Sequence, residues 1–126
     1  MSRRSPLGRV RGLGSAKEGV SHWWAQRLTA LALVPLALWF VASVAMMTGA
    51  DHESVRAWAA SPVVAGLLIL LIVATFYHMA LGLQVVIEDY VGREGVKVAA
   101  LILVQAASIV LGLIGVLSVL LLLFRV

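Results

Sequence analysis

The sequence contains no cysteine, so this chain can form no disulfide and can hold no iron–sulfur cluster, c-type haem or zinc ion through thiolates. Any metal bound by this chain alone would need histidine or oxygen ligands. Charged residues are also scarce, at 13% of the 126 residues, whereas 62% are hydrophobic. Soluble domains have roughly a quarter charged and about half apolar residues, so the composition excludes an ordinary soluble domain and favours a membrane protein.

The charge that is present is mainly basic, since ten Lys and Arg residues against six Asp and Glu residues give a net charge of +4. Such a balance can indicate nucleic-acid binding. Here, however, the basic residues lie outside the apolar runs and gather near the N-terminus, where they indicate orientation in a membrane. We therefore predict a lipid bilayer as partner and no nucleic acid.

Three long segments contain no Asp, Glu, Lys or Arg. They are residues 28–50, 57–87 and 98–124. Each exceeds the roughly 20 residues that a helix needs to cross about 30 Å of hydrocarbon, and none shows the alternating polarity of barrel strands. The predicted fold is therefore all-α, an integral membrane protein with three transmembrane helices, since backbone in lipid must satisfy its own hydrogen bonds. The predicted helices are residues 24–48, 62–88 and 98–124.

Basic residues are concentrated before the first predicted helix. Five of them, opposed by Glu18 alone, are Arg3, Arg4, Arg9, Arg11 and Lys17. The loop after that helix has Arg56 as its one basic residue, so the positive-inside rule predicts a cytoplasmic N-terminus and a C-terminus outside. We predict that residues 1–22 are a basic, flexible cytoplasmic segment and that residues 23–126 form the three-helix transmembrane domain.

His78 lies deep inside the second predicted helix. It precedes the inner boundary at Glu88 by about ten residues, roughly 15 Å, which places it close to the bilayer midplane. Gly82 lies one turn later on the same face and leaves room for a planar ligand. A neutral imidazole at this depth could ligate a haem iron, or it could hydrogen-bond to a carbonyl or a neighbouring helix. The residue pattern alone favours neither interpretation.

A second axial histidine would have to come from another chain. His22 precedes the first helix on the inner side, and His52 lies in the outer loop, so both are far from the depth of His78.

Three further polar residues lie near the inner boundary. Arg27 could extend to lipid phosphates, or it could pair with a haem propionate or polarise a quinone oxygen. Asp89 and Tyr90 end the second helix, where Tyr90 could anchor the interface or donate a hydrogen bond to a quinone carbonyl, with Asp89 beside it to orient it or relay protons.

Two segments together carry a resemblance to a known family. They are SHWWAQRLTA at residues 21–30 and HMALGLQVVIEDYV at residues 78–91. They resemble the small hydrophobic membrane-anchor subunit of succinate dehydrogenase in its alphaproteobacterial form. That family has a haem-ligating His on the second of three helices, a Gly one turn later, a Gln-Val pair, and an Asp-Tyr pair eleven and twelve residues after the His. Here the matching residues are His78, Gly82, Gln84-Val85 and Asp89-Tyr90.

The resemblance implies a multi-pass subunit of a succinate:quinone oxidoreductase in the bacterial inner membrane. It implies haem b shared with a second, cytochrome b556-type anchor, ubiquinone as electron acceptor, and FAD and iron–sulfur clusters only in a flavoprotein and an iron–sulfur partner subunit. The residue roles that it implies are axial haem ligation by His78, a haem-propionate or quinone contact by Arg27, a haem-propionate contact by His22, and quinone contacts by Tyr90 and Asp89. This chain itself would carry no catalytic residue for succinate oxidation.

Two other interpretations stay open at this point. In a homodimeric b-type cytochrome, His78 from each copy would bind one haem. In a haem-free scaffold, the helices would only tether a dehydrogenase and His78 would be a packing residue.

Overall fold

The computed structural model describes residue 6 and residues 16–124. Within residues 16–124 every regular element is a helix, which confirms the predicted all-α class. The helices are α2 (Ala16–Met46), α3 (His52–Ala59), α4 (Pro62–Tyr90) and α5 (Glu94–Phe124). Three of them, α2, α4 and α5, are long and apolar enough to cross a membrane. Except for residue 6, the part of the predicted flexible segment before residue 16 lies outside the described residues.

The long helices extend beyond the predicted spans. Helix α2 begins at Ala16 rather than near residue 24, and α5 begins at Glu94 rather than residue 98. Hydropathy, on which the prediction rests, marks the part of a helix that crosses hydrocarbon. Helical hydrogen bonds join backbone groups, so a helix continues into the headgroup region where the side chains become polar.

The connection between α2 and α4 is predicted to be a loop, but it contains the short helix α3. The Asp51 carboxylate accepts a hydrogen bond of 2.9 Å from the backbone N–H of Ser54 and so caps the start of α3. Hydrogen bonds from Ser54 also lower the pKa of Asp51. At the other end of α3, Trp58 stacks on Trp39 of α2 with ring centroids 5.9 Å apart. These contacts fix α3 across one end of the molecule.

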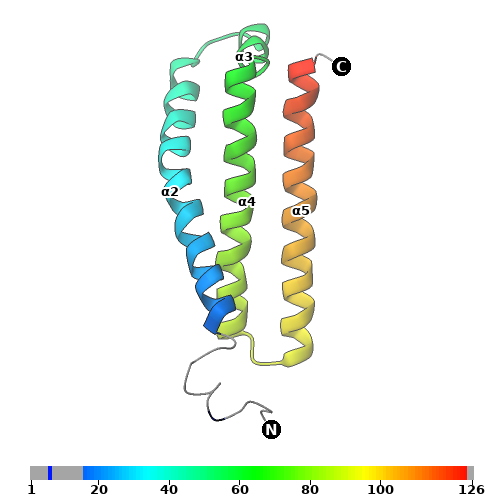
Figure 1. Ribbon diagram of the computed structural model, residues 1–126. Coiled ribbons are helices and arrows are strands. Elements are labelled where there is room, and N and C mark those ends of the chain that lie inside the picture. The colour runs from blue at the N-terminus through cyan, green and yellow to red at the C-terminus, as the bar shows by residue number, and fades with distance from the viewer. Residues whose placement is uncertain (1–5, 7–15, 125–126) are drawn as a thin grey trace.

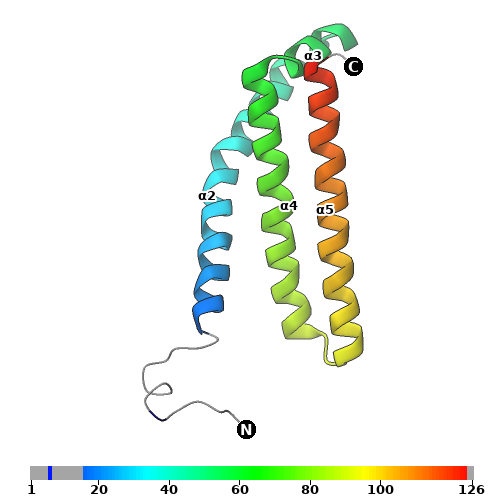
Figure 2. The ribbon, with the colours of Figure 1, turned by 45° about the vertical axis from the view of Figure 1, so that its right-hand side comes forward.

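Helix α4 is the centre of the arrangement. It lies between α2 and α5 and packs against both, as both views of the ribbon show (Figures 1 and 2). Within residues 16–124, α2 and α5 have no Cα atoms within 8 Å of each other. The start of α2, the end of α4 and the start of α5 lie at one end of the molecule, and α3 lies at the other (Figure 1). Which end faces the cytoplasm stays a prediction.

Small residues allow α5 to approach α4 closely. The sequence shows Ser108, Gly112 and Gly115 on one face of α5, and the structure identifies α4 as the helix that this face contacts. A Cβ atom on Gly112 would lie 3.6 Å from the Phe76 ring, and one on Gly115 would lie 3.2 Å from Ile72 Cγ2. Ser108 is buried in the same interface. The approach is tight at Gly115, where Ile72 would have to shift to admit a Cβ, whereas a Cβ on Gly112 would make an ordinary van der Waals contact.

The helices bury very little among themselves. The buried apolar residues in the described part of the chain are Ala59, Ala65, Ala80, Leu81 and Val119, and no large side chain there is fully buried. Large apolar side chains are exposed on all three long helices. In a membrane these surfaces must meet lipid or other protein chains.

We expect Gly115→Leu to destabilise the packing of α5 on α4, because its Cβ already meets Ile72 and the remaining atoms have no space. Overpacking of this kind costs about 1–3 kcal/mol. The measurement is thermal unfolding of the protein in detergent. Gly66→Leu is the matched control, since nothing lies within 4 Å of a Cβ built on Gly66 of α4. Equal stability of the two variants would contradict the packing role of Gly115.

Candidate functional site

One face of α2 carries three polar residues toward α4. His22, Gln26 and Thr29 are spaced i, i+4 and i+7, which puts them on one side of the helix. Thr29 meets His78 of α4, and Gln26 lies beside Gly82 of α4. The polar groups of the first two spans are thus brought together on the inner half of the molecule, as defined by the predicted orientation.

The closest of these contacts joins the Thr29 hydroxyl to the His78 imidazole. Thr29 Oγ1 lies 2.9 Å from His78 Nδ1, and also 2.7 Å from the carbonyl oxygen of Ala25. Two oxygen atoms 2.7 Å apart require a proton between them, so the hydroxyl donates to the Ala25 carbonyl. Its lone pair then accepts the hydrogen bond from His78, which puts the imidazole proton on Nδ1. Nε2 therefore carries the free lone pair.

A cavity of about 400 Å³ opens between α2 and α4, and neither Thr29 nor His78 lines it. Its lining residues are Gly19, His22, Trp23, Gln26, Arg27, Gly82 and Val85. Two polar atoms are buried without a hydrogen-bond partner, namely His22 Nε2 and Gln26 Oε1. Buried polar groups are normally paired, so these two indicate a polar ligand or partner at this position.

Arg27 contributes a positive charge to the rim of the cavity. Its guanidinium carbon lies 5.3 Å from the centre of the Trp23 ring, which is a cation–π contact. The Arg27 side chain is exposed, and the Trp23 and Trp24 rings meet edge to face, 5.0 Å apart. Arg27 is therefore held near the cavity by an aromatic surface while its N–H groups stay available.

Asp89 and Tyr90 end α4, as the sequence predicts, but neither lines the cavity. Both are exposed, and Tyr90 has 84% of its surface accessible. The structure thus brings His22 and Arg27 together with Gly82, and His78 together with Thr29, and it leaves Asp89 and Tyr90 on an open surface at the end of the helix.

Two residues of this site were missed by sequence reasoning. The sequence analysis does not assign a role to Gln26 or Thr29, although both lie in the segment that carries the resemblance. The signal that could have found them is their spacing from His22, because three polar side chains on one face of an apolar helix require partners. Residues 16–124 contain no group of three metal-ligating side chains.

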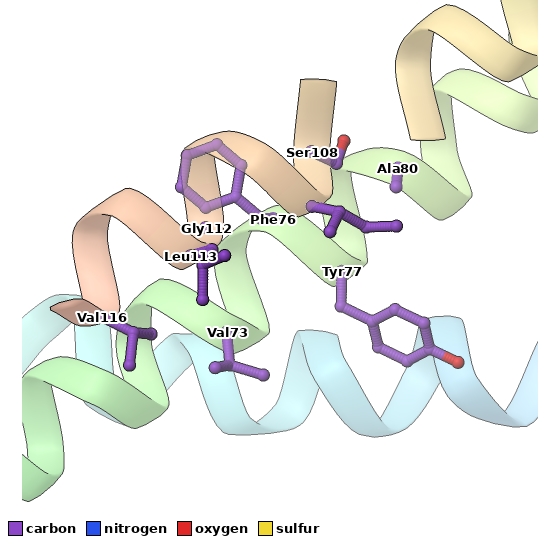
Figure 3. A pocket seen from close by; sticks show the side chains of 9 residues that line it. Val73, Phe76, Tyr77, Ala80, Ser108, Gly112, Leu113 and Val116 are labelled. Atoms are coloured by element: carbon purple, nitrogen blue, oxygen red, sulfur yellow. The ribbon is translucent and has the colours of Figure 1, made fainter. Parts of the chain in front are cut away.

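A second cavity, of about 380 Å³, lies between α4 and α5 (Figure 3). It is lined almost entirely by apolar atoms, from Val73, Phe76, Tyr77, Ala80, Ser108, Ile109, Gly112, Leu113 and Val116. Ser108 Oγ is buried there without a partner. This cavity has no charged group and is separate from the polar site between α2 and α4.

Comparison with known proteins places this chain in a family of transmembrane subunits. Residues 1–123 match the family described as succinate dehydrogenase/fumarate reductase transmembrane subunit. The succinate dehydrogenase hydrophobic membrane anchor subunit of Rickettsia bellii is 32% identical over 106 residues, which cover 84% of this chain and 85% of the relative. The same subunit of Paracoccus denitrificans is 34% identical over 98 residues, 78% of this chain and 75% of the relative. No solved structure matches the chain.

The chain therefore belongs to the succinate dehydrogenase/fumarate reductase transmembrane subunit family. It is a multi-pass bacterial inner-membrane protein of the succinate dehydrogenase membrane-anchor type. The family resemblance predicted from the two sequence segments is confirmed.

Proposed function

We propose that this membrane anchor helps to bind haem b and the quinone that accepts electrons from succinate oxidation. The observation that carries the proposal is the state of His78. Its Nδ1 lies 2.9 Å from the Thr29 hydroxyl, and in the neutral ring this contact leaves the lone pair of Nε2 free within an apolar span. A neutral imidazole with one nitrogen committed to a hydrogen bond is the usual form of an iron-ligating histidine.

The donor set of the site fits a haem. One axial ligand would come from His78, and the apolar surfaces of α2 and α4 suit a porphyrin ring. Haem also carries two propionate groups, which need hydrogen-bond donors and positive charge. The cavity between α2 and α4 offers both, from the unpartnered His22 Nε2 and from Arg27. When bound, the haem supplies a one-electron redox centre.

Tyr90 and Asp89 support a quinone contact at the end of α4. Reduction of a quinone leaves charge on its oxygens, and proton uptake neutralises it, so the site needs a donor close to water. The Tyr90 phenol is an exposed donor one residue from the Asp89 carboxylate. Because both side chains are open in this chain, the remaining walls of a quinone site would come from partner subunits.

The proposed assembly has three other subunits. A flavoprotein with FAD oxidises succinate, an iron–sulfur subunit conducts the electrons, and a second, cytochrome b556-type anchor supplies the other axial haem ligand. The small buried core and the exposed apolar faces of the three long helices support a chain that needs partners. Ubiquinone is the proposed acceptor.

We expect His78→Ala to abolish the low-spin haem b spectrum, because no other histidine of this chain lies at that depth. The measurement is the optical spectrum of the assembly purified through a tag on this chain, with flavin and iron–sulfur content showing that the partner subunits are present. His52→Ala is the matched control, since His52 begins α3 at the opposite end of the molecule. An unchanged low-spin spectrum in His78→Ala would exclude His78 as ligand.

Arg27→Leu should weaken haem retention or quinone reduction by about ten- to a hundredfold, the loss expected for a hydrogen bond from a charged group at about 1.5–3 kcal/mol. Arg56→Leu in α3 removes an equal charge at the far end and should change neither property. Haem content and quinone-linked activity of the two purified assemblies give the comparison. If Arg27→Leu matches Arg56→Leu in both measurements, Arg27 contacts only lipid headgroups.

Tyr90→Phe should lower quinone reduction about tenfold, since it removes one hydrogen bond, worth about 1.4 kcal/mol, at an exposed position. Succinate oxidation with a soluble artificial acceptor should stay at the parent level, because that reaction takes place in the flavoprotein. The measurement is the ratio of the two activities in one preparation. Tyr77→Phe, on the same helix, is the control. If Tyr90→Phe keeps the parent's ratio of quinone-linked to artificial-acceptor activity, Tyr90 only anchors the helix at the membrane interface.

A further inference from the structure

We propose that Thr29 is a positioning residue for the axial imidazole of His78. In this role, which rests on the proposed function, Thr29 fixes the proton on Nδ1, holds the ring against rotation and makes Nε2 a stronger electron donor. The inference names a residue on α2 that acts on the iron through a ligand on α4.

The direction of the hydrogen bonds supports this role. The Thr29 hydroxyl has one proton, and the 2.7 Å contact with the Ala25 carbonyl uses it. A β-branched threonine in a helix commonly adopts the rotamer that makes this bond to the preceding turn. The backbone of α2 therefore fixes the orientation of the Thr29 hydroxyl, and the lone pair that faces His78 can only accept a hydrogen bond.

Thr29 is the residue of α2 that bonds to the His78 ring. Among the described residues, the side-chain hydrogen bond of His78 is to Thr29, and neither His22 nor Gln26, the other polar residues on this face of α2, bonds to the His78 ring. Ser43, further along α2, makes the same bond to its own helix, 2.7 Å from the Trp39 carbonyl oxygen. No hydrogen bond from Ser43 to another helix is found in the described residues, which makes Ser43 a natural comparison for Thr29.

The hydrogen bonds that join Ala25, Thr29 and His78 would change how strongly Nε2 of His78 donates electrons to a bound iron. Metal-ligating histidines usually donate their second N–H to a carboxylate, a carbonyl or water, which raises the basicity of the ligating nitrogen. In this apolar span a hydroxyl that itself donates to a backbone carbonyl takes the place of these partners. A more electron-rich Nε2 stabilises ferric over ferrous iron, so the bond lowers the reduction potential of the haem.

The test compares four forms of the purified complex: the parent, Thr29→Val, Thr29→Ser and the control Ser43→Ala. Valine keeps the shape of threonine without its hydroxyl, and serine keeps the hydroxyl. One measurement is the rate of haem transfer to excess apomyoglobin, and the other is the midpoint potential of the haem in a redox titration. If Thr29→Val does not assemble, Thr29→Ala, which adds no volume, replaces it in both measurements.

We expect Thr29→Val to transfer haem to apomyoglobin about 10- to 100-fold faster than the parent, in line with the loss of metal affinity when a hydrogen-bond partner of a ligand is removed. Its midpoint potential should shift in the positive direction. Thr29→Ser should restore both properties, and Ser43→Ala should match the parent.

The role of the Thr29 hydroxyl would be overturned if Thr29→Val had the haem-transfer rate and midpoint potential of the parent, or if Thr29→Ser changed both as much as Thr29→Val. Either result would leave His78 as ligand. A parent complex without haem, or a His78→Ala complex that keeps its low-spin spectrum, would instead overturn the proposed function.

Discussion

The hydrogen bonding of polar groups in hydrocarbon governs this structure. In hydrocarbon, backbone N–H and C=O groups must find partners within the protein, and helical hydrogen bonds supply them along the three long helices, except at Pro35 of α2, which has no N–H to donate. The same requirement applies to side chains. Ser43 and Ser118 donate their hydroxyl protons to carbonyls one turn earlier on their own helices. Thr29 does the same, and its remaining lone pair links α2 to α4 through His78.

The two helix interfaces differ in how they are made. The interface of α5 with α4 is mainly apolar and is tightest at Gly115, where the absence of a side chain allows close packing. Both interfaces have a cavity, but only the one between α2 and α4 is lined by a charged residue, Arg27. In the described residues, two buried atoms without partners lie in this interface, whereas the α4–α5 interface has one, Ser108 Oγ. The tightest apolar packing and the proposed haem site therefore lie on different sides of α4. This helix contributes small or apolar contacts on one side and His78 with Gly82 on the other.

Much of the fold was predictable from the sequence, because long apolar runs have one stable solution in lipid. The number of spans, the end of α4 at Tyr90 and the shared face of His78 and Gly82 all follow from hydropathy and helical periodicity. Helix α3 is not marked by hydropathy because it is short and its cap, Asp51, is a local signal that hydropathy does not use. The stacking of Trp58 on Trp39, in contrast, joins two helices and follows only from the tertiary fold. The bond between Thr29 and His78 was missed for the same reason, since 49 positions separate the two residues.

The sparse internal core has a consequence for how the protein is made. The part of the chain that the structure describes buries no large side chain completely, so its helices gain little by packing on one another and depend on lipid and on other chains for further stabilisation. By mass action, the folded fraction of newly inserted chains then rises with the supply of partner subunits in the same membrane. A cell that makes this anchor in excess would accumulate molecules with an open cavity and unsatisfied polar atoms inside the bilayer. Balanced synthesis of the subunits, rather than the intrinsic stability of this one, therefore sets the yield of the assembly.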